Sequence, residues 1–379
     1  MNKVLHIIRD PVLGGAEILV KNVINADEDI QYRHYLLYCR SGPLLKLIKP
    51  EKKNRCVKVG FRNRLVFIWN LRRLILSNSI FLVHTHQPID AVFAILATIG
   101  SATKIVKTYH GYSGIYSDKA SISAKVLLCN AIINRFVSMH FFVSHDLLAY
   151  NRRVNPKQDC KRQRVLWNGI DTEELLGRPK ADMATELKIP SDSILMGMVG
   201  SFSRGRDQYT LCVALKKLIA DNRKIHFLFV GGRVDKYNYL YCECRRYCLE
   251  NHLDNNVHFL GVRDDIGGIL KSIDVYVHSS NNDTFGFALV EAMIVGVPCI
   301  ASNIPPFHEV SDEGKHVLLF NKGDDNDLRN KIDETLREIG TEQSAKKCIE
   351  AREFAIRNFS IAIHQKKLHE SYRSIDTHR

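Results

Sequence analysis

Two acidic side chains lie eight residues apart in the segment NNDTFGFALVEAM, and they are the first residues that point to chemistry. Asp283 falls in a polar loop after a strand-like run, and Glu291 falls one to two turns inside the helix expected to start near Gly286. The two carboxylates therefore need not share one helix face, and could contact different parts of one extended ligand. The loop amides around Phe285, Gly286 and Phe287 would point at its phosphates.

A nucleotide-sugar is a ligand that suits this arrangement. Its hydroxyl-rich sugar would lie near the loop acid Asp283, its diphosphate at the helix start, and its ribose diol on Glu291. The alternative is structural, because an acid in such a loop often caps the following helix and a helix glutamate is usually solvated. This segment alone is compatible with both interpretations.

Other loops after strand-like runs carry side chains suited to a diphosphate. Arg204 and Arg206 lie in SFSRGRDQYTL, in the turn before a helix, where planar guanidinium groups could grip phosphates bidentately. The run HFLFVGG ends in a glycine pair that includes Gly231 and is followed by Arg233, so this loop could also pass close to a ligand. For the arginine turn, a solvated basic turn is the alternative.

A glycine pair also opens the first helical segment. Gly14 and Gly15 follow the run KVLHIIR, and glycines at such a place let backbone N–H groups approach an anion. The pattern is not G-x-G-x-x-G, and no acidic residue closes the second strand at Cys39. A dinucleotide-dependent dehydrogenase is therefore excluded.

Three clusters have partial metal spacing, and we expect none of them to hold a metal. Asp325 and Asp327 have the D-x-D spacing of metal-dependent transferases, but their loop is expected to cap the next helix. His84 and His86 share one face of a strand, and no third ligand with metal spacing is evident nearby. The third cluster is Cys242, Cys244 and Cys248. It lacks paired C-x-x-C motifs, so a structural helix face is expected, with a metal site as the alternative.

Strand-like runs alternate with helical segments twice along the chain. The runs are KVLHIIR, RHYLLYC, FLVHTHQ, KIVKTYH, HFFVSH and RVLWNG in the first half, and ILMGMVG, HFLFVGG, VHFLG, VYVHSS, VPCIAS and HVLLF in the second. Near-continuous apolar strands separated by helices imply parallel sheets covered on both faces. We therefore predict an α/β fold with two doubly wound domains that face each other, with chemistry in the loops after the strands and in the cleft between the domains.

The chain of 379 residues is too long for one ordinary core, which agrees with two domains. A segment rich in Gly, Pro and charges at 172–193 marks the seam, giving domains at 1–180 and 181–360 and a final helix at 361–379. No apolar run reaches the roughly 20 residues that span a bilayer, and the N-terminus does not resemble a signal peptide. Together with singly scattered cysteines, this predicts a cytoplasmic protein.

The net charge of +13 is unevenly distributed. Residues 1–180 hold 28 Lys and Arg against 13 Asp and Glu, a net +15, whereas residues 181–379 hold 26 against 28, a net −2. The basic segment 49–74 interleaves its charges with aromatic and aliphatic residues such as Phe67 and Trp69. This suits an anionic surface, lipid-linked substrate or nucleic acid. A solvated basic helix whose apolar residues face the core is the alternative.

These motifs together resemble the retaining GT-B glycosyltransferases of family 4, over nearly all of the chain. DTFGFALVEAMIVGVPCIAS is similar to that family's E-x7-E pair, whose second acid opens E-A-M-x-x-G-x-P. Seven further segments occur in the family's order: GGAE, KTYHGY, VSH, WNGID, GSFSRGRD, FVGG and VHFLGVRDDI. The resemblance implies a GT-B fold of two Rossmann-like domains, the first for the acceptor and the second for a nucleotide-sugar. It also implies a C-terminal helix that crosses back to the first domain.

The resemblance assigns roles to individual residues. The implied catalytic residues are His110, Asp283 and Glu291, with His110 facing the sugar, Asp283 on the donor-sugar hydroxyls and Glu291 on the ribose. The implied donor-binding residues are Gly14, Gly15, Arg204, Arg206, Gly231, Arg233, Phe285, Gly286, Phe287 and Glu291. Arg206 replaces the family's usual diphosphate-binding lysine. The chain departs from the family at Asp283, which is one methylene shorter than the usual Glu. This change implies a recruited water or a shifted donor sugar, with an altered or lost activity as the alternative.

The implied reaction is transfer of a sugar from a UDP- or GDP-sugar to a hydroxyl of a saccharide acceptor, with retention of configuration and without a metal or other cofactor. Because the first domain is basic and carries aromatic residues, we expect a lipid-linked acceptor at the inner face of the plasma membrane, in assembly of a bacterial capsule, O-antigen or exopolysaccharide. The donor and acceptor stay open, since they depend on residues 113–118, on Arg233 and on the basic loops.

Two other functions compete with this one. A non-catalytic protein that binds nucleic acid or an acidic membrane would explain the charge of the first half, but not the acids, arginines and glycines in the second-half loops, so we expect no nucleic-acid partner. A nucleotide-sugar epimerase or hydrolase of the same fold is the second alternative. Product analysis with and without acceptor separates these functions.

Overall fold

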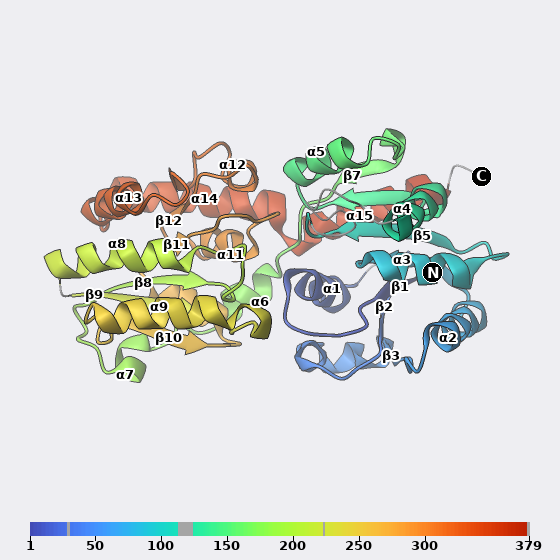
Figure 1. Cartoon of the computed structure of the whole chain (residues 1–379), viewed down its shortest axis with the longest axis horizontal. Coiled ribbons are helices and arrows are strands. Elements are labelled where there is room, and N and C mark those ends of the chain that lie inside the picture. Colours follow the sequence, from blue (N-terminus) through green and yellow to red (C-terminus); the bar gives the residue numbers. More distant parts are fainter. Residues whose placement is uncertain (29–30, 113–123, 223, 377–379) are drawn as a thin grey trace. The chain divides into compact units, whose positions relative to one another are not determined.

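The chain folds into two compact α/β units, shown in Figure 1. This computed structural model describes residues 1–28, 31–112, 124–222 and 224–376. One unit comprises Met1–Ile170 together with Ile361–Arg379, and the other comprises Asp171–Ser360. The first boundary thus lies ten residues before the one predicted at 180/181. Its position follows from the short helix α6 (Thr172–Gly177), which packs on helices of the second unit.

The first unit is built on a seven-stranded parallel sheet with the order β3-β2-β1-β4-β5-β6-β7. Its strands are β1 (Asn2–Ile7), β2 (Tyr32–Tyr38), β3 (Cys56–Lys58), β4 (Ile80–Thr85), β5 (Lys104–Tyr109), β6 (Met139–Phe142) and β7 (Gln163–Val165). Its helices are α1 (Gly15–Asn25), α2 (Arg64–Ser77), α3 (Pro88–Thr98), α4 (Ala124–Phe136), α5 (His145–Val154) and α15 (Ile361–Asp376), with short 3-10 turns at Pro43–Lys46, Pro50–Arg55 and Cys160–Arg162.

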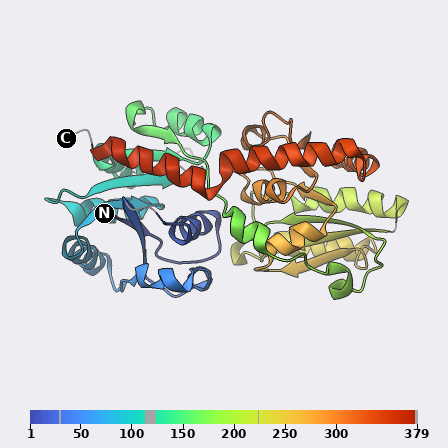
Figure 2. The same cartoon turned by 180° about the vertical axis from the view of Figure 1, so that it is seen from behind.

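Alternate strand residues of this unit pack on opposite faces of the sheet, as the period of two requires. Leu5 and Val83 pack with helices α2, α3 and α4, whereas their neighbours Val4 and Leu82 pack with α15. Figure 2 shows α15, in red, running along the sheet of the first unit. Its Tyr372 is fully buried against that sheet. The last helix therefore belongs to the core of the unit in which the chain begins.

The second unit is built on a six-stranded parallel sheet with the order β10-β9-β8-β11-β12-β13. Its strands are β8 (Ile194–Val199), β9 (Ile225–Val230), β10 (Val257–Gly261), β11 (Val275–His278), β12 (Cys299–Ser302) and β13 (Leu318–Phe320). Its helices, besides α6, are α7 (Met183–Leu187), α8 (Gln208–Asp221), α9 (Asn238–Glu250), α10 (Ile266–Ser272), α11 (Phe287–Val295), α12 (Pro305–Val310), α13 (Asp325–Glu338) and α14 (Glu342–Phe359), with a 3-10 turn at Asp235–Tyr237.

The prediction of two parallel α/β sheets is confirmed, and the order of strands decides which loops meet. In the second sheet β8 lies between β9 and β11, so the loops that follow these three strands come together at one edge. Apolar residues of α8, α9 and α13 cover one face of this sheet. Among the described residues, no helix combines the length and apolar character needed to cross a membrane.

Candidate donor site and the histidines of the first unit

An ion pair between Arg206 and Asp283 joins the two central loops of the second unit. Arg206 lies in the loop after β8, and Asp283 lies in the loop after β11. The Nη1 of Arg206 donates to Oδ2 of Asp283 and, at 3.0 Å, to Oγ of Ser280. Both charged side chains are largely buried. The structure thus brings together two residues that the sequence analysis placed in separate loops.

The other oxygen of Asp283 organises the start of α11. Oδ1 accepts hydrogen bonds from the backbone amides of Thr284 (2.7 Å), Phe285 (3.3 Å) and Gly286 (3.3 Å). These contacts order the loop that precedes α11, but they do not cap the helix, since α11 begins at Phe287 and its N-cap Gly286 has no side-chain cap. The amides of Phe285 and Gly286, predicted to point at phosphates, here contact a protein carboxylate instead.

The charge of Asp283 is strongly favoured by its surroundings. Burial alone would raise the pKa of this carboxyl, but the positive charge of Arg206 and a hydrogen bond from Nε2 of His278, 3.4 Å from Oδ2, hold the pKa far below its usual range. Burial alone would likewise lower the pKa of Arg206, but the Asp283 carboxylate more than offsets it and the pKa is raised. The pair is therefore fully ionised at neutral pH.

Backbone contacts hold the two loops against each other. The carbonyl oxygen of Gly205 accepts from the amides of Asn281 (2.9 Å) and Asn282 (3.0 Å). A Cβ on Gly205 would lie 2.7 Å from the carbonyl oxygen of Asn282, so only glycine allows this approach. The amide of Asp207 donates to the carbonyl of Ser279 at 3.1 Å. Arg206 is therefore positioned by its backbone as well as by its charge.

Two of the predicted donor-binding glycines have conformations that require glycine. Gly286 precedes α11 with φ of +85°, and a Cβ there would lie 2.7 Å from the ring of Phe307. Gly231 has φ of +155°, and a Cβ there would lie 2.1 Å from the carbonyl oxygen of Gly200. Gly286 thus lets the ring of Phe307 approach the start of α11, and Gly231 lets the loops after β8 and β9 approach more closely than any side chain would permit.

The remaining predicted residues of the second unit flank this pair. Arg204 is exposed and makes no ion pair with any described residue. Arg233 is also exposed, and its guanidinium lies 4.8 Å from the ring centroid of Tyr241. Glu291 is half-buried in the second turn of α11, as is Phe287 at the first position of that helix.

The predicted residues of the first unit lie at the ends of β1 and β5. Gly14 is the N-cap of α1 and Gly15 its first residue. The carboxylate of Glu17 lies over Gly14, since a Cβ on Gly14 would be 2.5 Å from its Oε2. Burial raises the pKa of Glu17. This acid was not among the predicted site residues, although the motif GGAE contains it. Its carboxylate occupies the helix start where an anion was expected.

His110 follows β5 and is held by a second histidine. Its Nε2 lies 2.9 Å from Nδ1 of His86. Burial, and to a lesser extent the charge of Lys107, lower the pKa of His110 to about 3, so its ring is neutral at neutral pH. Residues 113–118, which were expected to influence specificity, lie outside the described residues.

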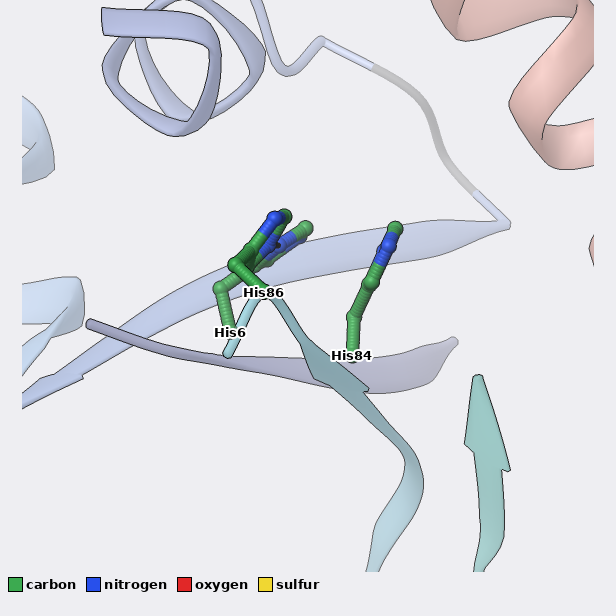
Figure 3. Close-up of side chains that lie close together, drawn as sticks. All are labelled: His6, His84 and His86. Carbon is green, nitrogen blue, oxygen red and sulfur yellow. Dashed lines mark hydrogen bonds between the residues drawn. The ribbon is translucent and has the colours of Figure 1, made fainter. Parts of the chain in front are cut away.

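The expectation that His84 and His86 lack a third partner was wrong. Sheet pairing of β1 with β4 places His6 beside them, and one ring nitrogen of each lies within 4.8 Å of the others. Figure 3 shows the three rings side by side. Each of their ring nitrogens already has a hydrogen-bond partner: His86 and His34 for His6, Tyr372 and Thr108 for His84, and His6 and His110 for His86.

The D-x-D segment and the cysteine cluster at 242–248 make structural contacts with other described residues. Asp324 caps α13 by accepting from the amides of Asn326 and Asp327, and Asp325 pairs with Lys217 at 2.8 Å. In α9, Cys242 is exposed while Cys244 and Cys248 are buried. Sγ of Cys248 lies 3.8 Å from that of Cys212 on α8. The D-x-D residues Asp325 and Asp327 thus lie in the first turn of α13, directly after its cap, and the cysteines lie on a helix.

Comparison with known proteins decides what this scaffold is. The family described as Glycosyl transferases group 1 matches residues 180–353, and the family described as Glycosyltransferase Family 4 matches residues 13–174. The chain belongs to the glycosyltransferases. The two matched regions correspond to the two units, and the predicted family resemblance is confirmed.

Solved structures show that this glycosyltransferase has the GT-B fold. The Anabaena protein HepE, in complex with UDP and glucose, has a TM-score of 0.84 at 18% identity, covering 99% of this chain and 100% of that one. A glycosyltransferase from Rickettsia africae has a TM-score of 0.83 at 19% identity, covering 100% and 99%.

Curated relatives of this glycosyltransferase include proteins of polysaccharide assembly. The O-antigen biosynthesis glycosyltransferase WclY of Escherichia coli is 27% identical over 152 residues, a match that spans only 40% of either chain. The UDP-Gal:alpha-D-GlcNAc-diphosphoundecaprenol alpha-1,3-galactosyltransferase of Escherichia coli is 23% identical over 318 residues, which cover 80% of this chain and 79% of that protein.

Proposed function

We propose that this protein is a retaining glycosyltransferase that moves a sugar from a nucleotide-sugar, a UDP- or GDP-sugar, to a hydroxyl of a saccharide acceptor. The observation that carries the proposal is the buried pair of Arg206 and Asp283 at the carboxyl ends of β8 and β11, with Glu291 in the helix that follows. The complex of HepE with UDP and glucose supports a nucleotide-sugar donor.

The residues of the second unit suit a nucleoside diphosphate as leaving group. Negative charge grows on the diphosphate as the glycosidic bond breaks, and preorganised cations stabilise that charge. Contacts with Asp283 and Ser280 position the guanidinium of Arg206. The exposed Arg204 supplies a second guanidinium. Two such groups beside a helix N-terminus would support transfer without a metal ion.

Asp283 has a dual role in this proposal. Its carboxylate fixes both Arg206 and the amides that precede α11, so it shapes the diphosphate site even without touching the sugar. The family resemblance assigns it to donor-sugar hydroxyls, and a carboxylate oxygen accepts more than one hydrogen bond. By the same resemblance, Glu291 binds the ribose hydroxyls and His110 faces the donor sugar.

We further propose a lipid-linked acceptor and peripheral binding to the cytoplasmic face of an anionic membrane, in assembly of a bacterial surface polysaccharide. The undecaprenol-linked substrate named for the Escherichia coli galactosyltransferase supports this acceptor class. The exposed residues of helix α2 support the proposal of binding to a membrane surface. Its Phe67, Leu71 and Ile75 face the core, but Leu65 and Trp69 are 80% and 61% exposed among basic side chains.

Product analysis tests the proposed reaction. Purified protein is incubated with UDP- and GDP-sugars, with and without a lipid-linked saccharide, and products are identified by mass spectrometry and by NMR of the anomeric carbon. We expect a new glycoside that requires the acceptor and keeps the donor's configuration. Release of free sugar in the absence of acceptor would indicate a hydrolase. Conversion of the nucleotide-sugar into its epimer would indicate an epimerase, and the absence of reaction with every donor would indicate a binding protein.

A further inference from the structure

Five imidazoles of the first unit form one continuous file of hydrogen bonds, which we call the histidine file. Nε2 of His110 lies 2.9 Å from Nδ1 of His86, whose Nε2 lies 3.1 Å from Nδ1 of His6. Nε2 of His6 lies 2.8 Å from Nδ1 of His34, and Nε2 of His34 lies 2.9 Å from Nε2 of His369. The file therefore runs from the loop after β5 to helix α15.

The topology of the sheet explains why residues so far apart in sequence meet. Strands β2, β1, β4 and β5 are consecutive neighbours, and His34, His6, His86 and His110 lie on or just after them. His6 has the same parity in its strand as Val4, which packs against α15, so its side chain points to that face of the sheet. His369 reaches the file from α15 itself.

The three inner members of the file, His6, His34 and His86, are neutral. His6, His34, His86 and His369 are each at most 4% exposed. Burial is the main cause that holds the pKa values of His6, His34 and His86 well below the usual value, and neighbouring histidines lower them further. A neutral imidazole has one N–H donor and one acceptor nitrogen. Each ring inside the file must therefore donate to one neighbour and accept from the other.

Only two proton arrangements satisfy every contact in the file. If His110 donates from Nε2, then His86, His6 and His34 each donate from Nε2 as well, and His369 accepts at its Nε2. If His369 donates instead, every donor reverses, and His110 accepts at Nε2 and carries its own proton at Nδ1. The tautomer of His110 is thus tied to that of a residue on the C-terminal helix.

We propose that His86, His6, His34 and His369 are positioning residues that fix the tautomer and ring orientation of His110. A fixed tautomer determines whether Nδ1 of His110 acts as a donor or as an acceptor toward a sugar hydroxyl. The effect on sugar transfer rests on the proposed function, whereas the fixed tautomer of His110 does not depend on it.

His84 provides a matched control for the file. It is as buried as the file members, and its ring stacks on that of His86 with 4.6 Å between centroids and lies tilted at 4.9 Å from that of His6. Its hydrogen bonds go elsewhere, to the hydroxyls of Tyr372 and Thr108, both at 2.7 Å. A metal bound by His6, His84 and His86 would need all three residues, but the file does not need His84.

The test is NMR of the full chain with ring-15N-labelled histidine, the His110 signals being assigned from their loss in His110→Gln. We expect wild type to show one protonated and one unprotonated ring nitrogen for His110. His369→Phe and His34→Phe, neither of which touches His110, should each shift its tautomer ratio about fivefold, the effect that one hydrogen bond typically supplies. His369→Gln, whose amide can donate or accept, should restore the wild-type ratio, and His84→Phe should leave it unchanged.

Several outcomes would overturn the proposal. These are near-equal populations of the two His110 tautomers in wild type, an unchanged ratio in a folded His369→Phe or His34→Phe protein, a shift in His84→Phe as large as in His34→Phe, or a stoichiometric metal found by elemental analysis. The wild-type spectrum alone tests whether the tautomer of His110 is fixed, even if a variant does not fold. Because the readout needs no substrate, it stands whether or not sugar transfer is detected.

A kinetic measurement then links the file to transfer. With donor and acceptor that support turnover, His369→Phe should lower kcat about tenfold and leave the donor KM within about twofold, because in this proposal His369 acts only through His110. Equal kcat values for His369→Phe and wild type, despite a shifted tautomer ratio, would separate the file from catalysis.

Discussion

Arg206 and Asp283 are separated by 77 residues in the sequence and are joined by a hydrogen-bonded ion pair that is largely shielded from water. Their contact links the loop after β8 to the loop after β11, and the same carboxylate holds the amides before α11. One acid thus positions both the cation and the helix start that the proposed diphosphate site requires.

Replacing the acid should cost substantial stability. In Asp283→Asn the charge of Arg206 stays buried without its partner, and we expect the free energy of unfolding to fall by about 3 kcal/mol in urea denaturation at neutral pH. Asp265→Asn is the control, since Asp265 pairs with Arg263 at 2.7 Å in a more exposed place and should cost less than about 1 kcal/mol. Equal losses in the two variants would contradict the role given to the buried pair.

The contribution of Asp283 should depend on pH in a defined direction. The pKa of this carboxyl is far lower in the folded protein than in an unfolded chain, where it is about 3.9. Its stabilisation is therefore complete above that unfolded value and is lost as pH falls toward the folded one. The difference in unfolding free energy between wild type and Asp283→Asn should be constant from pH 7 to about 5 and shrink below about pH 4. A difference that does not change with acidification would argue against a depressed pKa.

Gly286 should be intolerant of any side chain. Gly286→Ala imposes both a positive φ on alanine and a clash with Phe307, so we expect a loss above about 2 kcal/mol in thermal or urea unfolding. Gly323 has a similar φ of +77°, and no atom lies within 4 Å of an added Cβ, so Gly323→Ala isolates the backbone cost of about 1 kcal/mol. If Gly286→Ala lowers the free energy of unfolding no more than Gly323→Ala does, the close approach to Phe307 does not contribute to the cost.

The exposed face of α2 should govern binding to anionic vesicles. Arg62→Glu with Arg64→Glu, or Trp69→Ser alone, should reduce cosedimentation with vesicles containing an anionic phospholipid by about tenfold. Arg72 is unsuitable for this test, because it donates to the carbonyls of Ala97 (3.1 Å) and Ile99 (2.6 Å) at the end of α3.

The matched control for α2 lies in the second unit. Lys236→Glu with Lys346→Glu changes the total charge by the same amount at exposed positions away from α2. It should leave vesicle binding nearly unchanged. If both double variants lose binding equally, net charge rather than this helix attracts the membrane.

The sequence predicted the strands well because their apolar runs are buried on both faces. All twelve predicted runs contain strands, whereas the three-residue β3 was missed, because Cys56–Lys58 lies inside a basic segment and has no apolar run to mark it. The boundary between the units at 170/171 lies ten residues before the predicted 180/181, because packing assigns α6, which lies inside the predicted seam at 172–193, to the second unit.

The spacing of residues in the sequence did not predict which distant loops contact each other. Sequence motifs identify His84, His86 and His110, but nothing in their spacing indicates a contact with other histidines. His6, His34 and His369 meet them only through strand order and the return of α15. In the same way, Asp283 and Arg206 were both identified, but their pairing follows from the adjacency of β8 and β11.

The most direct test of the central claim is calorimetry of UDP-, GDP- and ADP-sugars binding to wild type, Glu291→Ala and the exposed-helix control Glu353→Ala, all with EDTA present. We predict micromolar binding of one nucleotide-sugar to wild type and the control. The affinity should fall about 100-fold in Glu291→Ala, which would remove the two proposed charge-assisted hydrogen bonds to the ribose. Absence of binding by every donor, or equal binding by all three proteins, would contradict a metal-independent donor site built on Glu291.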